Sequence, residues 1–208
     1  MFTGIIQDVG RVVSREARGG DVRLVITFGR LDPSGISVGD SICVQGCCLT
    51  AVELRDREFA ADVSRETLSL TTLDDLTPGS PVNLEPSLKA GDPLGGHLVS
   101  GHVDGVGDVT GISGDARSTR IVISVLPALS RYIARKGSVA IDGVSLTINE
   151  VQDTRFGINL IPHTQAVTTL GGLRVGTRVN IEVDQIARYV ERLLVDSDAL
   201  THRPSPAI

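Results

Sequence analysis

Short apolar runs bounded by polar residues, suited to β-strands, recur along the chain. Two of them, at residues 23–27 (RLVIT) and 120–124 (RIVIS), have the β-branched composition of half-buried strands. Clusters of Gly, Asp and Pro at 32–35 and 77–80 separate such runs. Many short strands within about a hundred residues indicate a small barrel or a sandwich. A barrel is favoured because closure leaves no strand edge exposed, and a sandwich remains the alternative.

The pattern of the first half returns in the second half at a constant offset of 97 residues. Residues 44–50 (VQGCCLT) align with 141–147 (IDGVSLT), and residues 82–85 (VNLE) align with 179–182 (VNIE). No gap is needed between these blocks. Because several blocks share one register, the sequence predicts one β-rich domain written twice, head to tail.

The end of each copy is marked by a change in composition. Gly and Pro cluster at 89–96, which predicts a first domain over residues 1–97 and a second over residues 98–184. Asp184 is a candidate N-cap for a helix over 185–197. One face of that helix is apolar and consists of Ile186, Val190, Leu193 and Leu194. This face packs either on its own domain or on another subunit. The polar, Pro-containing segment 198–208 is predicted to be disordered.

Composition narrows the function classes. The chain has 208 residues, of which 41% are hydrophobic and 22% charged, as in an ordinary folded protein. Its net charge of −5 and the lack of a Lys/Arg run argue against nucleic-acid binding. No apolar run is long enough to span a bilayer, so no membrane association is expected. No secretory signal is visible at the N-terminus, which favours the cytoplasm.

The three cysteines all lie in the first copy, as Cys43, Cys47 and Cys48. An odd number in one short stretch is a poor disulfide framework and fits a reducing compartment. Adjacent cysteines without a nearby His do not have zinc-ligand spacing, so no metal site is expected.

The two copies differ at positions that could carry chemistry. These pairs are Ile5 and His102, Gln45 and Asp142, Cys48 and Ser145, Glu66 and His163, and Ser87 and Asp184. The glycines around His102 favour a role in a site over a structural role. For His97 a structural role is favoured, Cys48 reads as a small buried residue, and Lys136 reads as an exposed charge. The residues alone therefore predict a binder of small molecules with two similar but chemically unequal sites.

Several of these segments resemble the signatures of the riboflavin synthase family over almost the whole chain. The segments are 1–5 (MFTGI), 46–50 (GCCLT), 95–105 (GGHLVSGHVDG), 136–138 (KGS), 142–147 (DGVSLT), 161–164 (IPHT) and 179–184 (VNIEVD). The resemblance implies an all-β fold of tandem duplicated six-stranded Greek-key β-barrels with a short C-terminal α-helix. It also implies a homotrimer held by the C-terminal helices, with no metal and no organic cofactor.

The reaction implied by the resemblance is a dismutation. Two molecules of 6,7-dimethyl-8-ribityllumazine exchange a four-carbon unit and give riboflavin and 5-amino-6-(ribitylamino)pyrimidinedione. Whether the chain also associates with lumazine synthase stays open. The runner-up is a non-catalytic lumazine or flavin antenna protein that shares the duplicated barrel, and a transport or regulatory binding module is a weaker third reading.

The resemblance also suggests roles for individual residues. His102 is the expected base or proton relay, with Ser145, Thr147 and Asp184 in the second barrel. Ser41, Cys48 and Thr50 of the first barrel would activate or bind the second lumazine. The other expected substrate contacts flank these residues in both copies: Phe2, Gly4, Ile5, Ile6, Leu49, Asp62, Val63, Ser64, Arg65, Glu66, Thr67, Gly101, Val103, Lys136, Leu146, Asn159, Leu160, Ile161, Pro162, His163 and Thr164.

Overall fold

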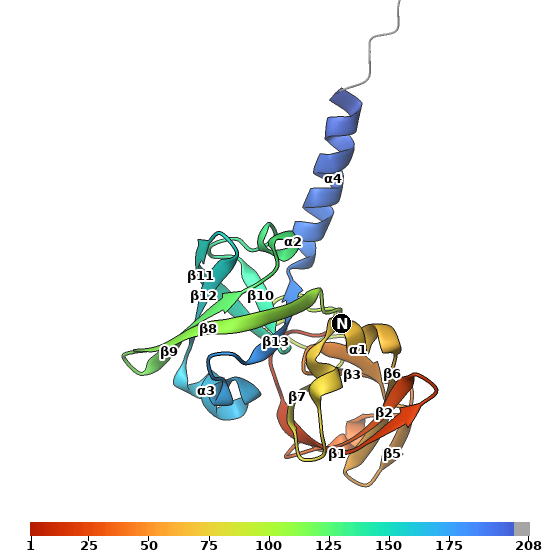
Figure 1. Cartoon of the computed structure of the whole chain (residues 1–208). Coiled ribbons are helices and arrows are strands. Elements are labelled where there is room, and N and C mark those ends of the chain that lie inside the picture. Colours follow the sequence, from red (N-terminus) through yellow and green to blue (C-terminus); the bar gives the residue numbers. More distant parts are fainter. Residues whose placement is uncertain (202–208) are drawn as a thin grey trace, which may run out of the picture.

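The computed structural model describes residues 1–201, and it describes side chains up to residue 194. Two β-rich lobes lie against each other, and one helix projects away from them (Figure 1). Within the described part of the chain, no helix is long and apolar enough to cross a membrane.

The first lobe is a seven-stranded antiparallel sheet in the order β4-β3-β7-β1-β2-β6-β5. Its strands are β1 (Asp8–Arg18), β2 (Asp21–Thr27), β3 (Ser41–Val44), β4 (Cys47–Thr50), β5 (Glu53–Arg55), β6 (Glu58–Val63) and β7 (Pro81–Pro86). Short helical turns lie between them: η1 (Pro33–Gly35), α1 (Arg65–Leu70) and η2 (Thr72–Asp75). The two edge strands, β4 and β5, are consecutive in the chain, and the sheet forms a half-barrel rather than a closed one.

The second lobe is a closed barrel in the order β10-β11-β12-β9-β8-β13. Its strands are β8 (Gly105–Asp115), β9 (Ser118–Ser124), β10 (Ser138–Ile141), β11 (Val144–Gln152), β12 (Arg155–Leu160) and β13 (Arg178–Val183). Its helices are α2 (Pro127–Ser130), α3 (Pro162–Val167) and η3 (Thr169–Gly172). The prediction of a duplicated barrel is confirmed. The single strand β11 corresponds to β4 and β5, which a break at residues 51–52 separates in the first lobe.

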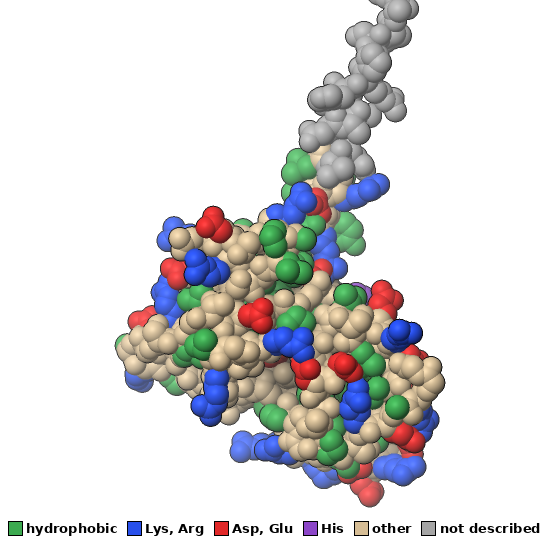
Figure 2. Space-filling view, viewed as in Figure 1, with side chains coloured by type: hydrophobic (Ala, Val, Ile, Leu, Met, Phe, Trp, Pro, Cys, Tyr) green, Lys and Arg blue, Asp and Glu red, His purple; other side chains and the backbone are tan. Residues whose placement is uncertain are grey.

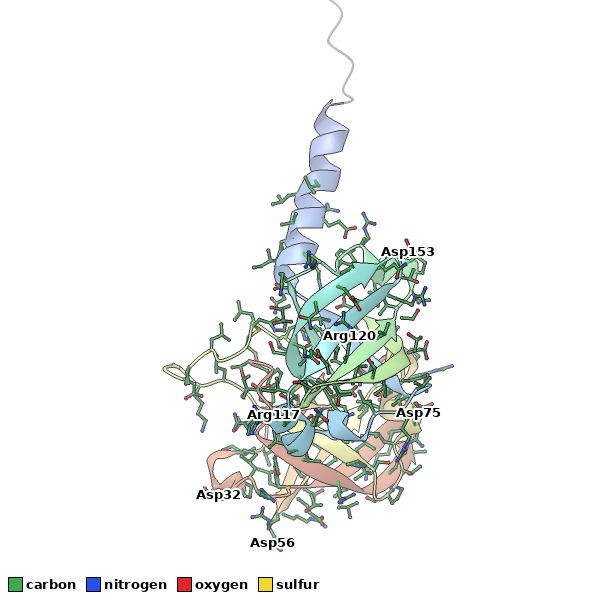
Figure 3. The ribbon with its side chains drawn as sticks, turned by 90° about the vertical axis from the view of Figure 1, so that its left-hand side faces the viewer. Asp32, Asp56, Asp75, Arg117, Arg120 and Asp153 are labelled. Atoms are coloured by element: carbon green, nitrogen blue, oxygen red, sulfur yellow. The ribbon has the colours of Figure 1, made fainter. Side chains whose placement is uncertain are left out.

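Each barrel has its own apolar core, built by alternation along the strands. On β2, Val22, Leu24 and Ile26 point inward and are at most 4% exposed. On β9, Ile121 and Ile123 do the same. The turns also repeat, and Figure 3 labels the equivalent turn residues Asp56 and Asp153, one on each lobe.

A third, smaller cluster joins the barrels, and it contains Phe2, Cys43, Val99 and Ala140. Phe2 and Val99 are equivalent residues of the two copies, and each donates its N–H to the carbonyl of the other, at 2.7 and 3.1 Å. A reciprocal contact between equivalent residues is the mark of a two-fold relation. The two barrels are therefore related by an approximate two-fold axis that passes between these residues.

Helix α4 (Gln185–Thr201) follows the second barrel. The Asp184 carboxylate accepts the N–H of Ile186 at 2.9 Å, which confirms the predicted cap. The helix is longer than the predicted range of 185–197, so residues 198–201 are helical rather than disordered. The remainder of the predicted tail, residues 202–208, lies outside the described residues.

Candidate functional site

The segments that precede the two barrels cross over to each other's barrel. We call residues 1–7 leg 1 and residues 98–104 leg 2. In leg 1, the Gly4 carbonyl accepts the N–H of Ser145, on the second barrel, at 2.8 Å. In leg 2, the Gly101 carbonyl accepts the N–H of Cys48, on the first barrel, also at 2.8 Å. Each barrel therefore presents its β4 or β11 residue to the leg of the other copy.

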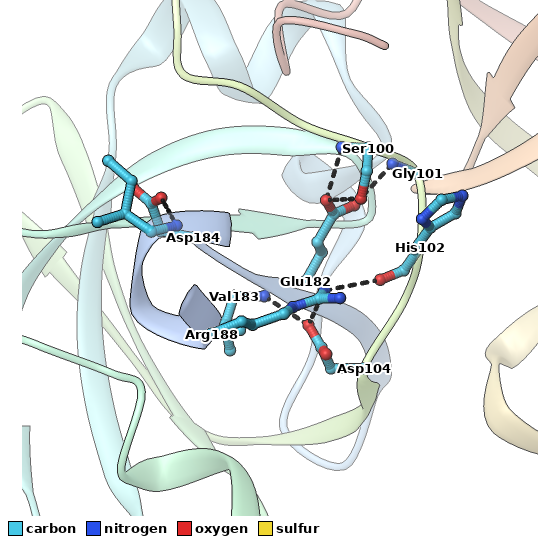
Figure 4. A network of polar contacts seen from close by, with 9 residues as sticks. Ser100, Gly101, His102, Asp104, Glu182, Val183, Asp184 and Arg188 are labelled. Carbon is cyan, nitrogen blue, oxygen red and sulfur yellow. Dashed lines mark hydrogen bonds and ion pairs between the residues drawn. The ribbon is translucent and has the colours of Figure 1, made fainter. Parts of the chain in front are cut away.

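A buried glutamate anchors each leg to its own barrel before it crosses. Glu182 accepts the N–H and hydroxyl of Ser100 at 2.7 and 2.6 Å and the N–H of Gly101 at 2.9 Å (Figure 4). Glu85 makes the equivalent bonds with Thr3 and Gly4, at 2.7, 2.7 and 3.0 Å. Burial raises the pKa of both carboxyls, and the donated hydrogen bonds oppose that rise.

Only glycine fits where a leg meets the opposite barrel. Gly4 has φ +75°, and a Cβ there would lie 2.5 Å from the Ser145 Cβ. Gly101 has φ +79°, and its Cβ would lie 2.6 Å from the Cys48 Cβ. Positive φ and close backbone approach are the two reasons why a chain needs glycine. The predicted involvement of both glycines in the site thus has a backbone explanation.

A cavity of about 200 Å³ lies where leg 2 meets the first barrel, and we call it site 1. Its lining consists of Cys47, Cys48, Glu66, Thr67, Leu70, Thr71, Gly101, His102 and Val103. His102 is therefore grouped with Cys48 and Glu66. This corrects the expectation that His102 works beside Ser145 in the second barrel, because the crossing of the legs exchanges the two partners. Val103 likewise packs against the core of the first barrel, and Ile6 packs against the core of the second.

The equivalent place on the second barrel, which we call site 2, is centred on Ser145. Its Oγ lies 2.7 Å from Nδ1 of His97. The Nε2 atom of His97 is buried and has no hydrogen-bond partner among the described residues. Burial lowers the pKa of His97 and so favours the neutral ring, against an opposing effect of the Asp184 charge. His97 therefore contacts Ser145, a predicted catalytic residue, although a structural role was expected for it.

The two-fold relation places the remaining residues of site 2. The offset of 97 residues maps Glu66 and Thr67 of site 1 onto His163 and Thr164, and it maps His102 onto Ile5. Each site thus has one histidine from the region before β8, His102 in site 1 and His97 in site 2. Sequence comparison of the copies missed His97 because no residue stands 97 positions before it. The glycine pair at 95–96 was the available signal in the sequence, and in the structure a Cβ on Gly96 would lie 2.8 Å from the Ser145 Cβ.

The hairpins β3–β4 and β10–β11 hold the other predicted catalytic residues. Ser41 pairs with Thr50 on the first hairpin, and Ser138 pairs with Thr147 on the second. Cys48 and Thr50 are two residues apart and share a face with Ser41, as do their equivalents Ser145 and Thr147. Cys48 is partly exposed on that face, which corrects the reading of this residue as buried. Lys136 is exposed in the turn before β10, as expected.

Some predicted contacts have side chains that are occupied elsewhere. Phe2 is fully buried between the barrels and cannot line a pocket with its ring. Three others point into the barrel cores and offer only backbone to a ligand: Leu49, Val63 and Leu160. Asp62 is paired with Arg23 and Ser64 caps α1. The remaining predicted contacts neighbour the residues of the two sites along the chain. They are Arg65 on α1, Leu146 on β11, Asn159 on β12, Ile161 before α3 and Pro162 on α3.

A charged network fixes leg 2 to the base of α4. Arg188 of the helix binds the Asp104 carboxylate at 2.8 Å and donates to the His102 carbonyl at 3.2 Å (Figure 4). Asp104 in turn accepts the N–H of Val183 at 2.8 Å. The position of the His102 backbone therefore depends on the start of α4.

Comparisons with known proteins agree with the duplicated site. The family model for the lumazine binding domain matches the chain twice, at residues 3–87 and 100–184. Riboflavin synthase of Photobacterium phosphoreum is 43% identical over 94% of this chain and 89% of its own length. Riboflavin synthase of Mycobacterium bovis is 45% identical over 93% of this chain and 98% of its own length. Among solved structures, LumP complexed with riboflavin has a TM-score of 0.82 at 30% identity, over 88% of this chain and 99% of that chain.

Proposed function

The chain belongs to the riboflavin synthase family, and from this premise we propose how its two barrels share the reaction. The protein is an enzyme that converts two molecules of 6,7-dimethyl-8-ribityllumazine to riboflavin and 5-amino-6-(ribitylamino)pyrimidinedione. One lumazine gives a four-carbon unit and the other receives it. The observation that carries the proposal is the pair of equivalent sites with unequal side chains, Cys48 and His102 in site 1 and Ser145 and His97 in site 2.

A reaction between two copies of one substrate gains from two binding domains. Each site holds one lumazine, and bringing the two rings together replaces a bimolecular encounter by a positioned one. The two molecules nevertheless play different parts, so two identical sites would not distinguish donor from acceptor. The unequal side chains provide that distinction.

In site 2, the His97–Ser145 pair is suited to proton transfer. The C7 methyl group of the lumazine is acidic, and its deprotonation starts the chemistry. A neutral imidazole with Nδ1 at 2.7 Å from the Ser145 hydroxyl can take a proton through that hydroxyl. Thr147 lies on the same face of β11, and the Asp184 charge favours the protonated ring once the proton has been taken.

In site 1, His102, Cys48 and Glu66 surround the other lumazine. Cys48 shares its face of the hairpin with Ser41 and Thr50, which supply hydroxyl groups to the same ligand. Addition of the thiol or of a water to the ring would activate this lumazine as the partner in carbon–carbon bond formation. His102 would carry the proton that this addition requires.

We further propose that the enzyme is a homotrimer assembled through α4. Beyond its base, where Glu191 accepts a hydrogen bond from Tyr132 of the second barrel, the helix projects away from both barrels in Figure 1. Hydrophobic side chains gather around its described part in Figure 2. Ile186, Tyr189 and Leu193 are 68–70% exposed. Isolated helices are marginal in water, so such a face is stabilised by packing on the helices of other subunits. The three free thiols fit a cytoplasmic protein.

The test is to mix the purified protein with 6,7-dimethyl-8-ribityllumazine, without added cofactor, and to follow absorbance and products by chromatography. We expect one riboflavin for every two lumazines consumed. Tight binding with shifted fluorescence and no product would instead identify a binding protein like LumP. Sedimentation of the same sample tests the trimer independently of the activity.

A further inference from the structure

The first hairpin carries two cysteines at directly opposite positions. Cys43 on β3 pairs with Cys48 on β4, and Val44 pairs with Cys47 next to the turn. The turn residues Gln45 and Gly46 have φ of +49° and +86°, as in the two-residue type I′ turn. In such a hairpin the pair that closes the turn is hydrogen-bonded, and the next pair is not. The N–H of Cys48 accordingly donates to Gly101 of leg 2.

The non-hydrogen-bonded position brings two side chains within reach of a disulfide. Opposite residues there have Cα atoms about 4.5 Å apart, and a disulfide accepts about 4.4–6.8 Å. Cys43 belongs to the cluster between the barrels, and Cys48 packs against that cluster. Cys47 points to the opposite face of β4, into the first core, so it is not placed to be the partner.

We propose that Cys43 and Cys48 are a peroxide-sensitive pair whose disulfide reversibly inactivates site 1. Cys48 lines the cavity of site 1 and is the thiol that a small oxidant reaches, whereas Cys43 is 1% exposed. Hydrogen peroxide converts the Cys48 thiol to a sulfenic acid and leaves one water. The Cys43 sulfur then attacks the Cys48 sulfur, forms the S–S bond and releases the second water. The two thiols thus lose two electrons and two hydrogens to the peroxide.

The disulfide changes one site and leaves the other unaltered. Its formation turns the Cys48 sulfur toward Cys43 and away from the cavity that would hold the lumazine. The second hairpin has Ala140 and Ser145 at the equivalent positions, so it cannot form this bond. Burial raises the pKa of Cys43 well above its ordinary value. Ring closure is therefore expected to be slower than the first oxidation.

The full-length protein is treated with hydrogen peroxide, quenched with catalase, alkylated and analysed by mass spectrometry and by activity. We expect Cys43 and Cys48 to escape alkylation together, a mass loss of two hydrogens, loss of activity, and recovery with dithiothreitol. Fragmentation of the peptide that spans both residues, in the unmodified sequence, assigns the bond without any variant.

Two variants separate the pair from its neighbour. Cys43→Ala copies the second hairpin, so it should lose activity through oxidised Cys48 without the two-hydrogen loss and should not recover once the sulfinic acid forms. Cys47→Ala keeps both members of the pair, so it should show the same two-hydrogen loss and the same dithiothreitol recovery, relative to its own activity before treatment. A bond from Cys48 to Cys47, or unchanged recovery in Cys43→Ala, would overturn the proposal. Because mass reports the bond directly, this result is separable from failure of the proposed enzyme activity.

Discussion

The two sites share a backbone and differ in their side chains. In each, the N–H of a β-strand residue binds the glycine carbonyl of a crossing leg at 2.8 Å, from Cys48 in one and from Ser145 in the other. The anchors, Glu85 and Glu182, make the same three bonds to their legs. Around these equal frames stand His102 and Glu66 in site 1, and His97 and His163 in the second copy.

This difference shows which part of a duplicated enzyme remains symmetric. Geometry that positions two identical substrates is common to both copies, and it resides in glycines, buried carboxylates and backbone bonds. The groups that we propose to move protons or add to a ring differ, as the different chemistry of donor and acceptor requires. The crossed legs also mean that each barrel completes the site of the other copy, so neither site is whole without both.

The largest expected effect comes from removing the two histidines one at a time. His97→Gln and His102→Gln should each lower turnover by about 100- to 10,000-fold, the usual contribution of a general acid or base. His97→Gln should have the larger effect, because His97 contacts the Ser145 hydroxyl directly. Steady-state kinetics measures turnover, and titration with riboflavin measures binding separately.

The control for this pair is binding. Riboflavin affinity should change only a few-fold in either variant if the histidines act in catalysis. An equal fall in affinity and turnover would assign them a structural role. Because burial lowers the pKa of His97, the wild-type rate should persist to a lower pH than an ordinary histidine would allow. Protonation then removes the base as the pH falls further.

The next effect concerns the turns where the barrels meet, which carry Gln45 in one copy and Asp142 in the other. Gln45 accepts the N–H of Asn83 and Asp142 accepts that of Asn180, at 2.7 and 2.8 Å. Burial raises the pKa of Asp142 from 3.8 to about 7. Its folded-state pKa lies above the unfolded value, so the fold favours the protonated form, and stability is lost as the pH rises from about 4 through about 7.

Asp142→Asn removes this titration and makes the two turns more alike. At about 1.4 kcal/mol per pKa unit, the wild type should lose roughly 4 kcal/mol across that range, and the variant should not. Urea unfolding between pH 4 and pH 8 measures this change in the free energy of unfolding, with Gln45→Asn as the matched control in the first turn. Parallel stability curves for wild type and Asp142→Asn would show that the carboxyl titrates alike in the folded and unfolded states, and would contradict the raised pKa.

A smaller effect tests the crossing of the legs. Glu182→Gln should weaken binding at site 1, because Glu182 holds Gly101 and the following His102, whereas Glu85→Gln should weaken binding at site 2. Each lost charge-assisted bond contributes about 1.5–3 kcal/mol to the leg, so affinity at the affected site should fall about tenfold or more. Protection of Cys48 from alkylation by bound riboflavin reports site 1 alone. Loss of that protection in Glu85→Gln would contradict the crossed arrangement.

The sequence was sufficient for those features that depend on neighbours along the chain. Short β-branched runs predicted the strands, the offset of 97 residues predicted the duplication, and Asp184 predicted the start of α4. The crossing was not predictable in this way. Equivalence between Gly4 and Gly101 says that they occupy similar places, but not which barrel each of them contacts. His102 was consequently assigned to the wrong partner residues.

Residues without an equivalent escaped the comparison for a related reason. His97 has no counterpart in the first copy, so a search for differences between copies could not find it. Asp142 looked like an ordinary turn residue, because its burial results from the second barrel packing on the first. The sequence pattern predicts each barrel, but it does not predict the contacts that form where the two barrels meet.

The smallest expected effect concerns the outer surface of the barrels. Arg23 donates to both carboxylate oxygens of Asp62 at 2.7 Å, which lowers the pKa of Asp62. In the second barrel Asn159 takes the place of Asp62, and Arg120, labelled in Figure 3, pairs with Glu150 instead. Exposed ion pairs are screened by water and salt and contribute little. Asp62→Asn, which copies the second barrel, should leave the thermal unfolding midpoint within experimental error. Riboflavin affinity should also stay unchanged, because Arg23 already occupies the carboxylate. A several-fold loss of affinity with an unchanged midpoint would mean that Asp62 leaves Arg23 to bind the ligand. The first barrel would then contact its ligand through a charged carboxylate, where the second barrel has only the neutral amide of Asn159.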